Sequence, residues 1–223
     1  MSKKKQVVIF GTSSFAEIVD IYLSADSPYE VVAFTVHDEY IKESKFRGKI
    51  VTPFEGLVKS YPPQDYDMFV AVGFSKLNRN RTAIYEQCKA NGYKMIQYIN
   101  SKTIQWGEIK VGDNVFILEN NVIQPFTEIG NNTILWSGNH IGHHSTIGNN
   151  VFISSHAVIS GNCRVGDNCF IGVNAAVADH VNIAPFSFIG MSAVITKDTV
   201  EKGVYKGPKS VPELYNTDEM RGL

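Results

Sequence analysis

An aliphatic residue recurs at every sixth position over the second half of this 223-residue chain. In steps of six from Val111 to Ile195, all 15 positions hold Ile, Leu or Val. The parallel register that starts at Val115 holds only small or β-branched residues. Two such registers superimposed in one segment define an internal six-residue repeat.

A six-residue repeat provides one short strand and one turn, so three repeats close a triangular coil of 18 residues. The aliphatic positions then fill the interior, and the small residues lie at the corners, where a larger side chain would not fit. Stacked coils form parallel strands, and five coils give a prism about 24 Å tall at the usual strand spacing. Polar pairs such as Asp113 and Asn114 occupy the turns. The repeat therefore predicts a three-sided parallel β-helix.

The first half of the chain has a different pattern, in which short apolar runs alternate with helical segments. Strands are expected over residues 6–10, 31–36, 68–72 and 94–99, and helices over residues 15–23, 54–61 and 78–90. This alternation predicts a small parallel α/β sheet of the Rossmann type. We therefore expect two domains, covering residues 1–98 and 99–223.

The composition gives no sign of an anionic macromolecular partner. The chain carries 21 Lys and Arg against 22 Asp and Glu, so neither nucleic acid nor a membrane surface is expected as a partner. The apolar run at residues 7–10 is too short for a signal peptide or a membrane span, which predicts a cytoplasmic protein. Cys163 and Cys169 fall in the corner register and are interpreted as small core residues.

Five of the six histidines lie in the repeat, and three of them fall within residues 139–145. On an 18-residue coil, Gly161 and then Asp179 stack over His143. Three interpretations remain open at this point. The histidines are solvated turn residues, or they hold zinc between subunits as in the γ-class carbonic anhydrases, or one of them is a general base for acyl transfer.

Four segments carry a resemblance to a known family: FGTSSFAEIV, ILWSGNHIGHHSTIGNN, GNCRVGDNCFIGVNAAV and EKGVYKGP. Over nearly its whole length the chain resembles the sugar acyltransferases of the bacillosamine and sialic-acid O-acetyltransferase group. This resemblance implies a left-handed parallel β-helix and acetyl-CoA as co-substrate, with no metal. It also implies a homotrimer with functional clefts between subunits.

The resemblance assigns the catalytic pair to His143, as general base, and His144. In the family the position of His144 often holds Glu or Asp, which orients the base. In this chain that role is either vacant or filled by another group, such as Asp179 or a residue of the next subunit. The Gly161 N–H is expected to stabilise the oxyanion of the acetyl group. Further cofactor contacts are expected at Asn162, Met191, Ser192, Lys206 and Lys209.

The glycine segment at residues 10–16 follows a strand and opens a helix, which is the context of a phosphate-binding turn. Ser13 and Ala16 replace the second and third glycines of a dinucleotide motif, so NAD is not expected. The resemblance implies that this domain binds the nucleotide of a nucleotide-linked sugar at the carboxyl ends of the strands. The expected contacts are Gly11, Ser13, Ser14, His37, Gly73 and Ser75.

The activity expected from this resemblance is acetyl-CoA-dependent N-acetylation of the 4-amino group of a nucleotide-linked 4-amino-4,6-dideoxy sugar. The transfer is direct, and the product serves the synthesis of a surface polysaccharide, such as O-antigen, or of another glycan. Three alternatives stay open: O-acetylation of a sugar such as sialic acid, metal-dependent hydration, and a non-catalytic trimeric scaffold.

Overall fold

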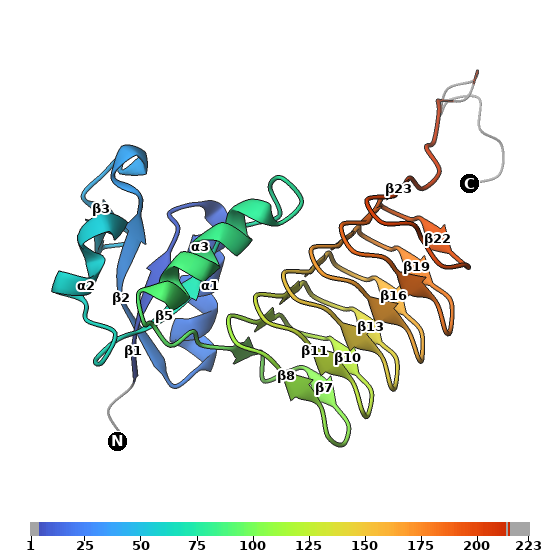
Figure 1. Ribbon diagram of the computed structural model, residues 1–223, viewed down its shortest axis with the longest axis horizontal. Coiled ribbons are helices and arrows are strands. Elements are labelled where there is room, and N and C mark those ends of the chain that lie inside the picture. The colour runs from blue at the N-terminus through green and yellow to red at the C-terminus, as the bar shows by residue number, and fades with distance from the viewer. Residues whose placement is uncertain (1–4, 213, 215–223) are drawn as a thin grey trace.

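The computed structural model describes residues 5–212 and 214. An α/β domain comes first, and Figure 1 shows it beside the first coils of a long β-helix. The α/β sheet has the strand order β3-β4-β2-β1-β5. Its strands are β1 (Lys5–Phe10), β2 (Tyr29–Val36), β3 (Lys45–Phe46), β4 (Lys49–Pro53) and β5 (Asp67–Val70). Its helices are α1 (Ser14–Asp26), α2 (Leu57–Ser60) and α3 (Arg79–Ala90), with 3₁₀ turns η1 (Asp38–Tyr40) and η2 (Phe54–Gly56).

The sheet of the α/β domain is buried on both faces. Val7 and Ile9 of β1 face a core that contains α1, whereas Val8 and Phe10 face a second core with Leu57 of α2. All strand pairs except β3–β4 are parallel, as the alternating sequence pattern predicts. No helix in the described part of the chain is long and apolar enough to cross a bilayer.

Two details differ from the expected elements. The short antiparallel hairpin β3–β4 was not expected, because β3 has only two residues. The predicted strand at residues 94–99 is wrong in its second half. Met95 makes a single bridge to Met68, but Tyr98 and Ile99 form the first strand of the β-helix. The β-helix therefore begins before the first aliphatic repeat position at Val111.

Within the described residues, the β-helix consists of three parallel sheets with 7, 6 and 5 strands. One sheet contains β6 (Tyr98–Ile99), β9 (Phe116–Ile117), β12 (Ile134–Leu135), β15 (Phe152–Ile153), β18 (Phe170–Ile171), β21 (Phe188–Ile189) and β23 (Val204–Tyr205). A second contains β7 (Ile104–Gln105), β10 (Val122–Ile123), β13 (His140–Ile141), β16 (Val158–Ile159), β19 (Ala176–Val177) and β22 (Val194–Ile195). The third contains β8 (Lys110–Val111), β11 (Glu128–Ile129), β14 (Thr146–Ile147), β17 (Arg164–Val165) and β20 (Asn182–Ile183).

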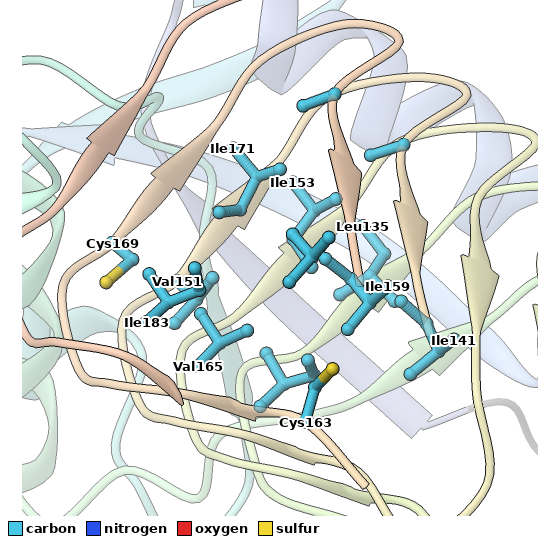
Figure 2. Close-up of a cluster of buried hydrophobic side chains, with 14 of the residues drawn as sticks. Leu135, Ile141, Val151, Ile153, Ile159, Cys163, Val165, Cys169, Ile171 and Ile183 are labelled. Atoms are coloured by element: carbon cyan, nitrogen blue, oxygen red, sulfur yellow. The ribbon is translucent and has the colours of Figure 1, made fainter. Parts of the chain in front are cut away.

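The predicted coil of 18 residues is confirmed by the strand register, in which Phe152 pairs with Phe170 and His140 with Val158. The second residue of every β-helix strand except β7, where it is the exposed Gln105, belongs to the interior core or packs against it. Figure 2 shows Leu135, Ile153 and Ile171 along one side of the interior, with Cys163 and Cys169 in the same core. Burial raises the pKa of the Cys169 thiol to about 11. The interpretation of both cysteines as small core residues agrees with this placement.

The turns of the β-helix explain several of the histidines. From Val115 to Ala193, the residue just before each corner position has a left-handed backbone, with φ of 55° at His144, 59° at His156 and 62° at His180. Asparagine fills half of the equivalent positions, for example Asn132 with φ of 56°. Asn and His adopt this conformation more readily than most residues. The backbone conformation of the turns therefore explains why histidine is found at these three positions. It does not explain His143, whose φ is not positive.

The three outer faces of the β-helix differ in character. The first face, which we call the covered face, lies under the α/β domain. Phe15 of α1 packs on Phe116 at 5.9 Å between ring centroids, and Phe74 packs on Phe152 at 5.0 Å and Phe170 at 4.8 Å. The α/β domain and the covered face share one hydrophobic core.

The other two faces are open in a single chain. The polar face, formed by the third sheet, presents Lys110, Glu128, Thr146, Arg164 and Asn182. The apolar face, formed by the second sheet, presents Ile104, Val122, His140, Val158, Ala176 and Val194. Val158 is 42% exposed and Val194 is 71% exposed. An apolar stripe of this kind, here interrupted by His140, is typical of surfaces that another molecule covers.

Candidate active site

His143 lies on the corner between the apolar face and the polar face. Its backbone N–H donates to Gln124 Oε1 at 2.9 Å, and its imidazole is exposed. Gly161 occupies the equivalent position one coil further on. A Cβ atom at Gly161 would lie 2.8 Å from both Cε1 and Nε2 of His143, so the ring rests in the space that the glycine leaves free.

The side chain that contacts the His143 imidazole is His144. The two Nδ1 atoms are 3.1 Å apart, and the two rings are nearly perpendicular. The His144 ring also packs against Phe126, with 4.7 Å between centroids. A hydrogen bond between two imidazoles needs one donor and one acceptor. When His143 donates from Nδ1, its Nε2 is unprotonated and able to accept a proton.

Asp179 does not contact the imidazole of His143, so the expectation that it orients the base is wrong for a single chain. Its carboxylate accepts a hydrogen bond from the Gly161 N–H at 2.9 Å. The reason is a ladder that recurs between coils. On the neighbouring corner, Asn149 accepts from the Asn131 N–H at 2.9 Å, and Asp167 accepts from the Asn149 N–H at 2.7 Å. The Gly161 N–H expected to face the acetyl group is thus occupied in this structure.

The remaining cofactor contacts that were expected lie on two edges of the apolar face. Asn162 is exposed on the His143 corner. Met191 and Ser192 lie on the other edge, where the apolar and covered faces meet. Lys206 and Lys209 are exposed in the segment after β23, close to Met191, because Gly207 packs against the Met191 carbonyl. One chain does not gather these residues into a single groove.

A cleft of about 700 Å³ lies at the carboxyl ends of β1, β2 and β5. This is the edge where parallel α/β sheets bind their ligands. Four of the six expected substrate contacts line it: Gly11, Ser13, His37 and Gly73. Ser14 and Ser75 are not among its lining residues. Ser14 begins α1, and the Ser75 hydroxyl accepts a hydrogen bond from Asn80 Nδ2 at 3.1 Å.

The sequence reasoning missed six further polar residues that line the cleft: Thr12, Glu39, Tyr40, Lys42, Lys76 and Asn80. Three of them also line an adjoining cavity of about 290 Å³ beneath the loop before β3. Most of the six follow β1, β2 or β5 within a few residues. This position after a strand is the sequence signal that could have identified them as cleft residues. In the same wall, His37 Nδ1 lies 2.7 Å from Glu55 Oε1. Hydrogen bonds from its own backbone N–H and from His37 lower the pKa of Glu55.

The cleft and His143 lie on opposite sides of the β-helix. The cleft belongs to the α/β domain, which packs on the covered face. His143 lies on the corner between the other two faces, and in a three-sided coil that corner is opposite the covered face. A single chain therefore keeps the two apart.

Among the described residues of one chain, no group of three or more His, Cys, Asp or Glu side chains is arranged to hold a metal ion. The zinc interpretation of the histidines consequently finds no ligand set within the part of a single chain that the structure describes.

Comparison with known proteins places the fold. Residues 108–143 and 126–161 match the bacterial transferase hexapeptide family, which is described by six repeats. No curated protein sequence matches the chain. The acetyltransferase domain of PglB from Neisseria gonorrhoeae has a TM-score of 0.80 at 23% identity, over 91% of this chain and 97% of that chain.

Two further solved structures are similar along both domains. PerB from Caulobacter crescentus, in complex with CoA and GDP-perosamine, has a TM-score of 0.80 at 23% identity, over 91% of this chain and 94% of that chain. WeeI from Acinetobacter baumannii has a TM-score of 0.76 at 18% identity, over 89% and 94%. The chain is thus a Rossmann-like α/β domain joined to a hexapeptide-repeat, left-handed parallel β-helix, which is the two-domain fold of these structures.

Proposed function

We propose that the protein is an acetyl-CoA-dependent N-acetyltransferase that acts on the amino group of a nucleotide-linked amino sugar. The observation that carries this proposal is the exposed His143 imidazole, which rests on Gly161 and contacts His144 at an open corner of a hexapeptide β-helix. The cleft at the strand ends of the α/β domain is large enough for a nucleotide. The fold shared with PerB, whose structure holds CoA and GDP-perosamine, supports the same substrates.

In the proposed reaction the neutral amine of the sugar attacks the thioester carbon of acetyl-CoA. A carbon–nitrogen bond forms, the carbon–sulfur bond breaks, and CoA leaves as its thiolate. His143 Nε2 takes the proton that the nitrogen loses, and the Nδ1 contact with His144 orients the ring for this transfer. The proton then passes to the thiolate or to solvent. General base catalysis of this kind contributes about 10²–10⁴-fold to the rate, and no covalent enzyme intermediate is needed.

The oxyanion that develops on the acetyl group needs a hydrogen-bond donor. Gly161 lies beside the His143 ring, and its N–H is the donor that we assign to this role. Because Asp179 accepts from this N–H in the present structure, acetyl-CoA has to displace the carboxylate when it binds. Asp179 is exposed, which leaves it room to move away.

Asp179→Ala is therefore expected to lower the KM for acetyl-CoA, by up to about tenfold for the loss of one competing charge-assisted hydrogen bond, without a fall in kcat. Asp167→Ala is the matched control, because Asp167 makes the same ladder contact on a different corner. Steady-state release of free CoA thiol measures both constants. A tenfold fall in kcat for Asp179→Ala would show instead that this carboxylate assists the base.

We further propose that the active site forms between copies of this chain in a homotrimer. The cleft and His143 of one chain lie on opposite sides of its β-helix, so a nucleotide bound in the cleft presents its sugar to the His143 of a neighbour. The apolar face, which borders the His143 corner, supplies the surface that the neighbour covers. Met191, Ser192, Lys206 and Lys209 on the far edge of this face are then available to CoA.

The proposed function is tested with a panel of UDP-, dTDP- and GDP-linked 4-amino sugars and acetyl-CoA, followed by thiol release. We expect turnover with one nucleotide class and none with free sialic acid, which serves as the O-acetylation arm. Turnover should persist after treatment with a chelator. If sialic acid gives thiol release and none of the nucleotide-linked amino sugars does, O-acetylation is favoured. Both proposed substrates belong to the cytoplasm, and the product suits surface polysaccharide or other glycan synthesis.

A further inference from the structure

Arg81, in the first turn of α3, is fully buried at the junction of the α/β domain and the β-helix. Its guanidinium donates five hydrogen bonds, and the acceptors are carbonyl or amide oxygens. On the β-helix the acceptors are the carbonyls of Asn132 (3.2 Å), Asn150 (3.0 Å) and Val151 (3.1 Å). On the loop after β5 they are the Gly73 carbonyl (3.0 Å) and Asn78 Oδ1 (3.0 Å).

This buried charge is costly for a residue that only joins two domains. Burial lowers the pKa of the Arg81 guanidinium to about 9, so it remains charged at neutral pH. Apolar residues of similar volume often replace buried ionic groups without loss of stability. The five donors of a guanidinium lie in a fixed plane, which suits it to hold several oxygens at defined positions. The arrangement of acceptors therefore points to a role in positioning the loop.

The loop that Arg81 holds is strained. Lys76, Leu77 and Asn78 form three consecutive left-handed residues, with φ of 50°, 53° and 65°. A residue other than glycine adopts this conformation only at an energetic cost. Asn78 is fully buried, and its Nδ2 donates to the Cys169 carbonyl of the β-helix at 3.0 Å. Strained backbone persists where the surroundings fix it, and it gathers at ligand sites.

The free side of this left-handed turn is the wall of the cleft. Gly73, whose carbonyl Arg81 holds, lines the cleft together with Lys76 and Asn80. Lys76 is exposed, so its ammonium group is available to a ligand in the cleft. Because a diphosphate carries the highest charge of a nucleotide-linked sugar, a lysine on the wall is suited to contact it.

We infer that Arg81 is a positioning residue for the nucleotide: it pins the left-handed turn 76–78 to the β-helix so that Lys76 contacts the diphosphate in the cleft. This inference rests on the proposed function. It means that the cleft has its binding shape only while the α/β domain is docked on the covered face. Nucleotide affinity then depends on the contacts between Arg81 and the β-helix, which do not involve the nucleotide.

The test compares the full-length wild type with Arg81→Lys, Asn78→Gly and Lys76→Met. Calorimetry gives the Kd of UDP, dTDP and GDP and, on the same preparations, the Kd of CoA. For the nucleoside diphosphate that the wild type binds best, we expect each variant to bind about tenfold more weakly, the loss of one charge-assisted hydrogen bond. The Kd of CoA should stay within twofold. Asn78→Gly keeps the left-handed conformation available and removes only the amide contacts.

Lys89→Met is the matched control, because Lys89 of α3 also joins the domains, through an ion pair with Asp113, but lies outside the cleft lining. It should leave the nucleotide Kd unchanged. The inference is overturned if Arg81→Lys and Asn78→Gly bind the nucleotide within twofold of wild type, whatever their melting temperatures. If Arg81→Lys fails to fold, Asn78→Gly and Lys76→Met decide in the same way. A wild type that binds none of the three nucleotides would overturn the proposed function as well.

Discussion

His143→Asn is expected to lower kcat by about 10²–10⁴-fold, the usual contribution of a general base. Asparagine is close to the imidazole in size and polarity but cannot take the proton from the attacking amine. The KM for acetyl-CoA should change little, because the Gly161 N–H and the outer faces of the β-helix are unaltered. Thiol release under saturating substrates measures the loss.

The control for this variant is His156→Asn. His156 is an exposed turn histidine of the same β-helix, but it lies on a different corner, where its ring rests against Gly138. Asparagine tolerates its left-handed backbone, so fold and kcat should match the wild type. A His143→Asn enzyme with a kcat near that of the wild type would remove the base from the mechanism.

Val158→Arg on the apolar face is expected to dissociate the oligomer and to reduce acetyl transfer to background. Val158 lies in the middle of the apolar stripe, and a guanidinium buried there without a partner costs several kcal/mol. The isolated chain should still fold, because the side chain points outward and is 42% exposed. The monomer would contain both the cleft and His143, but on opposite sides of its β-helix, so they could not act on the same substrate.

Light scattering after size-exclusion chromatography and thiol release on the same fractions test this expectation. The matched control is Thr146→Arg, which places the same side chain at the equivalent strand position on the polar face. It should keep both the oligomer and the rate. A monomeric Val158→Arg protein with wild-type turnover would show that one chain contains a complete site.

The β-helix could be predicted from the sequence because the same residue types recur at every sixth position. An interior position tolerates only aliphatic side chains, so Ile153, Ile159 and Ile171 mark the coil directly. The same argument placed His143 and Gly161 one coil apart. Five coils were too few, because Gln105 interrupts the aliphatic register before Ile99 of β6 is reached, and β23 lies beyond the last aliphatic position at Ile195.

Contacts between side chains from distant segments could not be read in this way. The repeat places Asp179 over His143, but the carboxylate binds the Gly161 N–H and leaves the ring to His144. Arginine is rarely buried, so an arginine in a predicted helix is expected to lie on the surface. The burial of Arg81 becomes evident only when the α/β domain is docked on the β-helix. Lys42 and Lys76 lie in loops, and the loop conformations that bring them to the cleft cannot be predicted from hydrophobic periodicity.

Mixing two inactive variants tests most directly whether the active site joins the cleft of one chain to the His143 of another. One variant is His143→Asn. The other is Gly73→Trp, which fills the cleft at a glycine where an added Cβ meets nothing within 4 Å. Each alone should be inactive, and subunits reassembled from an equal mixture should regain about a quarter of the wild-type rate, as random pairing of neighbours predicts. Mixed assemblies that stay at background would contradict a site shared between chains.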